Sequence, residues 1–451
     1  MSLGFEQASF DVVAAVELDP VHAAVHEYNF PECRVLCTDA STVSADDLLK
    51  RAGVRRGEVD VIFGGPPCQG FSLIGKRLSD DPRNTCLFHF HRLVAEIRPR
   101  YFVMENVAGL TLGPAREVLN AFIESSQEAG YKVVEPVRVL NSAEFGVPQD
   151  RRRVFILGYL PSQRKPRYPE ETHVARDKFG GPAVQRLIEE PLPLCPSVED
   201  AIGDLPDIDG FDELLDSDSV AYRFKGGSKY ARTLRGDLHD EDDYSYERLY
   251  DRTMLTASAR AEHTELSRQR FRATDWGATE TISRFFKLPP KGICNTLRAG
   301  TATDHGAFTS PRPIHPHHAR CISVREAARL HSYPDWFRMH VTKWHGFRQI
   351  GNSVPPRLAR AIAGSVRDAL GVSPRRPTKS ISLQNEWKLQ VDMAKAADHF
   401  NVSRHVIKPR LRQANGRRNL VVSTSRRSCY DARRSGEATT AARPGPTLDD
   451  L

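Results

Sequence analysis

Residues 59–72 read VDVIFGGPPCQGFS. The apolar run at the start is typical of a buried strand, and it leads into two glycines and two prolines that indicate a stiff turn. Cys68 follows this turn directly. In open α/β sheets, ligands bind beyond the carboxyl ends of the strands. The segment therefore predicts an α/β fold in which Cys68 lies at a binding site.

The residues on either side of this segment alternate between helical and strand patterns. In residues 86–97, apolar side chains recur at helical spacing, and residues 100–107, RYFVMENV, form the next apolar run. Alternation of this kind predicts parallel βαβ units in a doubly wound, Rossmann-like sheet. Further strands are expected over residues 11–18 and 147–160, and further helices over residues 22–30 and 116–130.

The alternation stops after about residue 160. Residues 161–290 are rich in Pro, Asp and Ser and hold two acidic clusters, DGFDELLDSDS and HDEDDYSYE, so we expect a second, irregular domain there. Regular patterns return in residues 323–337 and in a helix over residues 356–370 that begins with a proline. The predicted parts are a catalytic domain (1–160), an irregular domain (161–290), a return segment that completes the catalytic domain (291–372) and a basic extension (373–451).

Composition excludes several classes of protein. No run approaches the roughly 18 apolar residues of a membrane span, and the first ten residues lack a signal-peptide pattern, so we expect a cytoplasmic protein with no membrane contact. The eight cysteines are then expected to be reduced thiols. Cys33 and Cys37 have no second pair, and HPHH at 315–318 reads as a solvated loop. No metal site is therefore expected.

The formal net charge of +7 is concentrated in the tail. Residues 375–451 hold 16 Lys and Arg against 7 Asp and Glu, which leaves the preceding residues close to neutral. A basic tail indicates an anionic partner such as nucleic acid, or simply a disordered, well-solvated extension. Within it, residues 386–412 form either a small helix-turn-helix or a poorly structured segment.

Five short motifs occur in a fixed order along the chain. They are GGPPCQGFS (64–72), ENV (105–107), QDRRRVF (149–155), SVREAARLHSYPDWF (323–337) and RQIGNSVPP (348–356). In this order and at this spacing the sequence resembles the bacterial cytosine-C5 DNA methyltransferases. The resemblance implies a DNA (cytosine-5)-methyltransferase that uses S-adenosylmethionine and acts on double-stranded DNA. It also implies a monomer, and a restriction endonuclease of the same specificity as a functional partner.

The chemistry of such an enzyme accounts for two of the residues. C5 of cytosine is a poor nucleophile until a thiolate adds at C6, and the resemblance gives that role to Cys68. It places Glu105 at N3 of the base, where a shared proton eases the addition. The base must leave the helical stack to be reached. The alternatives are a small buried hydrophobic residue for Cys68 and a capping or ion-paired acid for Glu105.

Three polar residues occupy every second position in the strand expected over residues 147–160. Gln149, Arg151 and Arg153 are spaced two apart, so all three side chains are expected to face the same way. The resemblance implies that the arginines bind O2 of the flipped cytosine and the nearby DNA backbone, and that Gln149 contributes to substrate binding. The alternative is a solvated basic edge strand.

The resemblance also assigns a cofactor pocket. It gives Glu17 to the ribose hydroxyls and Asp39 to the adenine amine, with Pro67 and Asn352 lining the same pocket. Asn352 has an alternative role as the cap of the following helix. Residues 161–290 occupy the position of the family's target-recognition region, which reads bases in the major groove, so the acidic clusters are expected to face away from DNA.

One departure from the family pattern concerns the start of the sequence. The family begins with a strand and a Phe-x-Gly-x-Gly loop around the cofactor, whereas these residues resemble the family from just after that loop. Loss of a central strand exposes its two neighbours. The alternative function is therefore an inactive, truncated DNA-binding remnant; RNA methylation is a weaker third hypothesis, because no RNA-binding module is evident.

Overall fold

The computed structural model describes residues 1–67, 85–183, 192–300, 312–407, 411–414 and 417–420. The chain divides into two compact units, Met1–Ile407 and Lys408–Leu451. The described residues of the second unit form one antiparallel hairpin, β12 (Leu411–Ala414) with β13 (Arg417–Leu420).

The main sheet of the first unit has the strand order β3-β4-β7-β5, with β6 also paired to β7. β3 and β4 are parallel, as predicted. β7 is antiparallel to β4, β5 and β6, so the strand expected over residues 147–160 is not part of a parallel βαβ unit. The link from β6 to β7 is too short for the helical crossover that a parallel pair requires. The strands are β3 (Val61–Gly64), β4 (Tyr101–Val107), β5 (Lys132–Val133), β6 (Arg138–Asn141) and β7 (Arg152–Tyr159).

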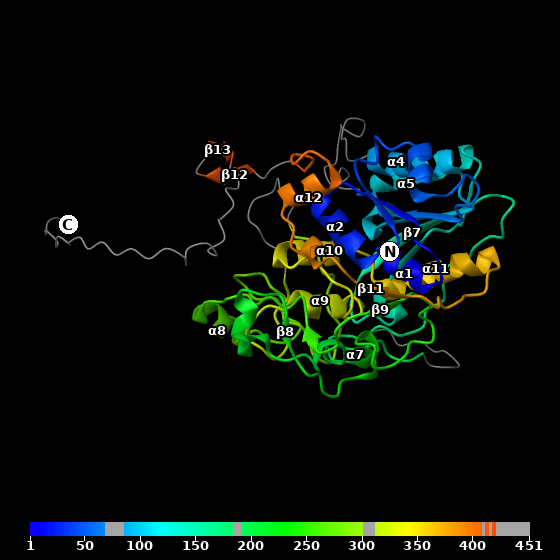
Figure 1. Ribbon diagram of the computed structural model, residues 1–451. Coiled ribbons are helices and arrows are strands. Elements are labelled where there is room, and N and C mark those ends of the chain that lie inside the picture. The colour runs from blue at the N-terminus through cyan, green and yellow to red at the C-terminus, as the bar shows by residue number, and fades with distance from the viewer. Residues whose placement is uncertain (68–84, 184–191, 301–311, 408–410, 415–416, 421–451) are drawn as a thin grey trace, which may run out of the picture. The chain divides into compact units, whose positions relative to one another are not determined.

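Helices cover both faces of this sheet (Figure 1). Alternate residues of β4 face opposite sides: Tyr101 and Val103 pack with α11, whereas Phe102 and Met104 pack with α4 and α5. This alternation gives the α/β/α layers of a doubly wound fold. The covering helices, close to their expected positions, are α4 (Thr85–Ile97), α5 (Ala115–Glu128) and α11 (Pro356–Leu370).

A second pair of parallel strands, β1 (Ala14–Glu17) and β2 (Arg34–Cys37), is joined by α2 (Pro20–Asn29). Among the described residues, β1 pairs only with β2, and β3 only with β4, so the parallel strands form two separate pieces. The first element is α1 (Ser2–Gln7), which packs along α11. A Cβ at Gly4 would lie 2.4 Å from that of Ala359, so this close packing requires glycine. α3 (Ala45–Ala52), between β2 and β3, was not predicted.

Residues 161–290 are irregular, as expected, but they share a core with the return segment. Val198 and Leu234 belong to the same apolar cluster as Leu297 and Leu330. The chain therefore packs continuously across residue 290, and the division into four parts stays a prediction. The elements of both regions are α6 (Val198–Ile202), β8 (Val220–Ala221), α7 (Lys229–Leu234), β9 (Glu247–Leu249), β10 (Met254–Leu255), α8 (Glu265–Ala273), α9 (Val324–Leu330) and α10 (Lys343–Asn352), with 3-10 turns at η4 (Ile208–Gly210) and η5 (Asp212–Leu215).

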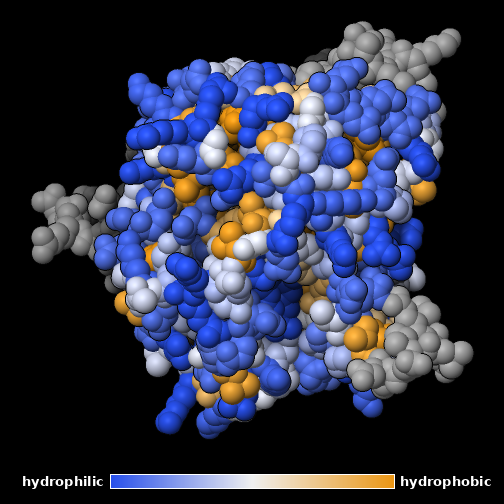
Figure 2. Space-filling model, turned by 90° about the vertical axis from the view of Figure 1, so that its right-hand side faces the viewer, coloured by the Kyte–Doolittle hydropathy of each residue, from blue (hydrophilic) through white to orange (hydrophobic). Residues whose placement is uncertain are grey.

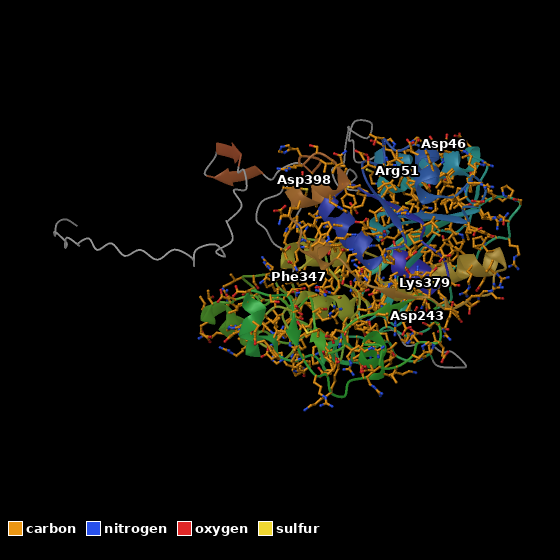
Figure 3. The ribbon with its side chains drawn as sticks, in the orientation of Figure 1. Asp46, Arg51, Asp243, Phe347, Lys379 and Asp398 are labelled. Atoms are coloured by element: carbon orange, nitrogen blue, oxygen red, sulfur yellow. The ribbon has the colours of Figure 1, made fainter. Side chains whose placement is uncertain are left out.

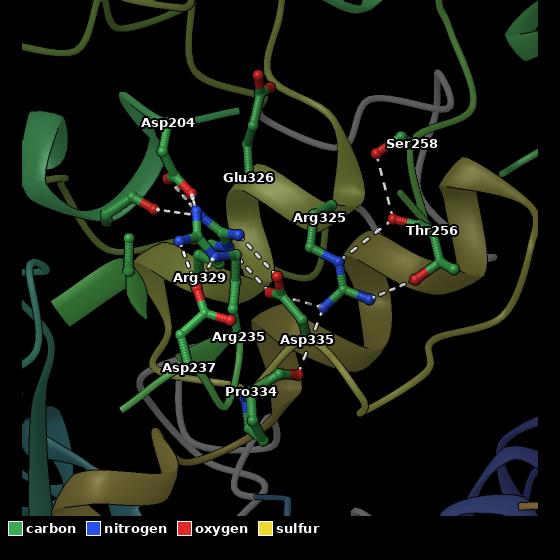
Figure 4. Close-up of polar contacts among 12 residues, drawn as sticks. Asp204, Arg235, Asp237, Thr256, Ser258, Arg325, Glu326, Arg329, Pro334 and Asp335 are labelled. Atoms are coloured by element: carbon green, nitrogen blue, oxygen red, sulfur yellow. Dashed lines mark hydrogen bonds and ion pairs between the residues drawn. The ribbon is translucent and has the colours of Figure 1, made fainter. Parts of the chain in front are cut away.

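A buried ion-pair network also joins these two regions (Figure 4). Arg329 of α9 lies 2.5 Å from Asp204 and 2.6 Å from Asp335, measured between nitrogen and oxygen atoms. Asp204 also contacts Arg235 at 2.5 Å, and Arg325 lies 3.6 Å from Asp335. Arg329 is fully buried, so its charge is tolerated only because both carboxylates are present.

We expect Asp335→Asn to destabilise the protein by about 3 kcal/mol, because it leaves two buried guanidinium groups short of negative charge. Urea denaturation measures the change. Asp398→Asn is the matched control, since Asp398 pairs with Arg404 at 2.8 Å but lies at the periphery in Figure 3, with both side chains more than half exposed. The control should cost less than about 1 kcal/mol. Equal losses would contradict a stabilising role for the buried network.

The acidic clusters of residues 209–219 and 239–247 are partly neutralised within the chain. Asp209 pairs with Arg268 at 2.6 Å, and Asp240 pairs with Arg360 at 2.9 Å. These pairings reduce the negative field that the clusters project. Their orientation relative to DNA stays a prediction.

The first part of the basic extension is folded onto the preceding chain, against both the irregular region (161–290) and the catalytic region. β11 (Ser380–Ser382) pairs in parallel with β9, and α12 (Met393–Phe400) packs against α2 (Figure 1). η6 (Glu386–Leu389) is a 3-10 turn, and no second α-helix follows α12 in the described residues 401–407. Residues 386–407 therefore do not form a helix-turn-helix.

The surface face shown in Figure 2 is mostly hydrophilic, with apolar residues in small patches. Within the described ranges, no helix combines the length and the apolar character that a membrane span requires.

Candidate active site

Glu105 lies near the carboxyl end of β4 and is only 8% exposed. Its Oε1 lies 2.8 Å from Nε of Arg153, which comes from the adjacent strand β7. Burial raises the pKa of the Glu105 carboxyl, and the nearby Arg153 and Arg151 guanidinium groups oppose that shift. The site therefore holds a carboxyl group that takes up a proton more readily than an exposed one does.

The turn after β3 lies directly against Glu105. A Cβ at Gly65 would lie 2.7 Å from Oε2 of Glu105, so the turn can approach the carboxyl group only because residue 65 is glycine. Nδ2 of Asn106 also donates a hydrogen bond to the Pro66 carbonyl, at 3.1 Å. The start of the GGPPC loop is thus fixed beside Glu105. Cys68 itself lies outside the described residues.

Arg151 and Gln149 point into the protein. Arg151 is 1% exposed, and its guanidinium donates hydrogen bonds to the carbonyls of Leu297 (2.9 Å), Gly351 (2.8 Å) and Ser353 (2.8 Å). Oε1 of Gln149 accepts a hydrogen bond from the Leu297 amide at 3.1 Å. The alternative of a solvated basic edge strand is wrong for these two residues, because both are buried and β7 lies inside the sheet.

The two acids assigned to the cofactor follow neighbouring strands. Glu17 ends β1, Asp39 follows β2, and Glu17 is in register with Cys37, so both acids lie at the same edge of the strand pair. Oε1 of Glu17 accepts a hydrogen bond from the Asp19 amide at 2.9 Å, and Asp39 is exposed. Two carboxylates at one strand edge suit ligands that carry hydroxyl and amine donors.

Pro67 and Asn352 are both exposed. Asn352 is the last residue of α10, and α11 begins only at Pro356, so the alternative of Asn352 as a helix cap is wrong. Gly351, directly before it, is held by Arg151. Asn352 is therefore anchored to the sheet through its neighbour.

The model of the C-5 cytosine-specific DNA methylase family matches residues 1–368. The chain belongs to this family. It is 51% identical over 412 residues to the Type II methyltransferase M.XorII of Xanthomonas oryzae pv. oryzae; the aligned region covers 91% of this chain and 92% of that protein. It is 30% identical over 427 residues to M.AgeI of Thalassovita gelatinovora, across 81% of this chain and 96% of the relative. The crystal structure of a prophage-encoded protein of E. coli, described as a DNA modification methyltransferase, matches with a TM-score of 0.62 at 30% identity, over 82% of this chain and 96% of that one.

This DNA methylase has a further buried residue beside Gln149 that was not predicted to have a role. His331 is fully buried; its Nδ1 accepts a hydrogen bond from Nε2 of Gln149 at 2.9 Å, and its Nε2 donates one to the Ser353 carbonyl at 3.2 Å. Burial lowers the pKa of His331 well below its usual value, which favours the neutral ring that this pattern requires. Gln149, Arg151 and His331 together form a return-segment latch, which fastens the residues around Leu297 and Ser353 to the catalytic sheet.

The contribution of the return-segment latch to stability can be tested by substituting Arg151. Arg151→Met removes the guanidinium hydrogen bonds to the carbonyls of Leu297, Gly351 and Ser353, so we expect a loss of about 3 kcal/mol in the free energy of unfolding, with Arg151→Lys recovering part of it. Chemical denaturation measures the change. Arg152→Met, at the mostly exposed neighbouring position, should change stability by less than about 0.5 kcal/mol. If the two methionine variants were equally stable, the latch would have no structural role.

The structure also corrects one prediction outside the site. His315 of the HPHH segment is 5% exposed, and its Nδ1 accepts hydrogen bonds from the amides of His317 and His318, each at 3.1 Å. His315 also lies 3.5 Å from Glu326. The prediction of a solvated loop is therefore wrong for His315, which is part of the folded core of the methylase.

Proposed function

We propose that this DNA methylase transfers a methyl group from S-adenosylmethionine to C5 of a flipped cytosine in double-stranded DNA, through a covalent bond between Cys68 and C6. One observation supports this most directly. The buried Glu105 carboxyl lies against Gly65, at the start of the loop that carries Cys68.

The two residues act on one base. The Cys68 thiolate adds to C6 while Glu105 shares a proton with N3, and the electron pair released by this addition makes C5 nucleophilic. After C5 has taken up the methyl group, loss of its proton expels the thiolate and restores the aromatic ring. Arg153, whose Nε lies 2.8 Å from Oε1 of Glu105, would contact the base beside that carboxyl. The resemblance assigned Arg151 to the flipped base and Gln149 to substrate binding. Because both are buried and bond to the return segment, we propose that they support the site indirectly, through the return-segment latch.

The residues at the strand edge fit the methyl donor. Glu17 and Asp39 would hold the ribose hydroxyls and the adenine amine, with Pro67 and Asn352 lining the same pocket. S-adenosylmethionine supplies an electrophilic methyl group when bound. Both acids follow parallel strands of one pair, which is where a doubly wound fold binds its ligand.

The names of the relatives support a role in restriction and modification. M.XorII and M.AgeI are both Type II methyltransferases, so we propose that this enzyme methylates the site of a partner restriction endonuclease. Residues 161–290 are then the part that reads the target sequence in the major groove. We further propose that the enzyme acts as a monomer.

A methyl-transfer assay tests this function. The full chain is incubated with tritiated S-adenosylmethionine and either genomic DNA or total RNA in separate reactions, and the nucleosides are separated. The expected result is label in 5-methylcytosine alone, with none transferred to an alternating dA–dT duplex, which has no cytosine. DNA binding without methyl transfer would favour the inactive DNA-binding remnant. Label in RNA but not in DNA would favour RNA methylation.

A further inference from the structure

We propose that Asp19, His22 and His345 form a binding site for one divalent transition-metal ion. One potential ligand atom from each of the three side chains lies within 4.8 Å of the other two. Asp19 and His22 lie at the start of α2, and His345 lies in α10. The donors are two imidazoles and one carboxylate, a set that zinc, cobalt and nickel bind well.

The local structure leaves the carboxylate free to bind. Asp19 caps α2: its Oδ1 accepts hydrogen bonds from the amides of Val21 at 3.0 Å and His22 at 3.4 Å. Its other oxygen, Oδ2, lies 3.9 Å from Nδ1 of His22. Capping thus fixes the orientation of the carboxylate while one oxygen still faces the histidine.

Two imidazole nitrogens in the cluster lack partners. Nε2 of His22 and Nδ1 of His345 are buried, and neither has a hydrogen-bond partner among the described residues. Leaving a buried polar group unsatisfied costs about 1–3 kcal/mol. The neighbouring His340 differs, because its ring nitrogens contact Thr342 and the Val391 carbonyl. A metal ion bound through Nδ1 of His345 would remove this cost at that residue; at His22 the nitrogen that faces Oδ2 of Asp19 is Nδ1, not the unpartnered Nε2.

The cluster lies at the edge of the buried interior. The side chains of Asp19 and His22 are 12% and 14% exposed. In a tetrahedral zinc site the ligand atoms are about 3.3 Å apart, given bonds of about 2.0 Å, so small rotations of the two rings close the cluster. Three protein ligands leave the remaining position to water.

The ion would join two elements of the cofactor edge. α2 starts directly after β1 and Glu17, and α10 ends at Asn352. A metal between α2 and α10 therefore clips the first strand pair to the return segment. The sequence did not indicate this site, because its ligands come from opposite ends of the folded region and match no metal-binding spacing.

Metal titration of the untagged full chain tests the proposal. The protein is stripped with a chelator, dialysed and titrated with Co²⁺, and d–d absorbance is followed; Zn²⁺ binding is then measured by equilibrium dialysis. The expected result is one ion per chain, a visible Co²⁺ spectrum that Zn²⁺ abolishes, and a melting temperature that rises with Zn²⁺. No saturable binding of either ion would overturn the proposal.

Variants locate the ion. Asp19→Asn keeps the helix cap, and His345→Gln keeps a polar side chain; each should weaken Co²⁺ binding by about 10-fold or more. His22→Gln provides a third variant if either of these fails to fold. His91→Gln is the matched control, because Nε2 of His91 in α4 is also buried without a partner, but among the described residues His91 belongs to no group of three potential metal ligands. Undiminished affinity in the ligand variants, or an equal loss in His91→Gln, would overturn the assignment.

Discussion

Cys68→Ser is expected to lower the rate of methyl transfer by about 10⁴-fold or more, the scale of loss seen when a covalent nucleophile is removed. A thiol has a pKa of about 8.5 and supplies some thiolate at neutral pH, whereas a serine hydroxyl is essentially never ionised. Without addition at C6, C5 cannot attack the methyl donor. Single-turnover assays with enzyme in excess over DNA measure the chemical step directly.

Covalent trapping separates this role from an indirect one. Duplex DNA in which 5-fluorocytosine replaces cytosine, offered with S-adenosylmethionine, cannot lose the C5 substituent and should hold the wild-type chain in a complex stable to denaturant. Cys68→Ser should form no such complex. Cys86→Ser is the matched control: burial raises the pKa of Cys86, which disfavours its thiolate, and the variant should still be trapped. A trapped Cys68→Ser protein would refute the assignment of the nucleophile.

The strongly periodic elements of the fold could be predicted from the sequence. The helices over 85–97, 115–128 and 356–370 and the strands over 61–64 and 101–107 each carry an unambiguous apolar pattern. The direction of β7 could not be predicted, because a strand pattern carries no information on its partner. The cohesion of residues 161–290 with the return segment rests on buried Arg–Asp pairs such as Arg329–Asp204, which look like surface charges in the sequence.

The candidate site, like the fold, could be predicted from the sequence only in part. A turn of glycine and proline after an apolar run was enough to predict that the GGPPC loop lies at a binding site, and the structure places the start of that loop beside Glu105. The two-residue spacing predicted that Gln149, Arg151 and Arg153 face the same way along one strand. Gln149 and Arg151 are both buried, but they precede β7, which begins at Arg152, so strand spacing does not account for their burial. It could not show that Arg151 bonds to the carbonyls of Leu297, Gly351 and Ser353, because those residues lie 146 to 202 positions away in the chain. His331 was missed for the same reason.

Glu105→Gln is expected to lower the rate of methyl transfer by about 10²- to 10⁴-fold, the usual contribution of a positioned acid. Glutamine fits the same space and still accepts a hydrogen bond from Arg153, so DNA binding should change little. Single-turnover rates and DNA-binding affinity are measured together. Glu128→Gln, at an exposed position in α5, should leave both unchanged. A glutamine variant that transferred methyl groups at the wild-type rate would exclude Glu105 as the acid.

The same substitution should remove the contribution of Glu105 to the pH dependence of stability. Burial raises the pKa of Glu105 above its ordinary value of 4.5, so folding favours the protonated form. The stability that the group contributes is fully present below pH 4.5 and is lost as pH rises through the folded-state pKa. Glutamine cannot ionise, so the stability of Glu105→Gln relative to wild type should increase with pH in this window, by at most about 1.4 kcal/mol per pH unit. Denaturation curves for both proteins from pH 4.5 upward measure the difference. A difference that stays constant or falls with pH would mean that Arg153 and Arg151 outweigh the burial, and that the carboxyl is held ionised.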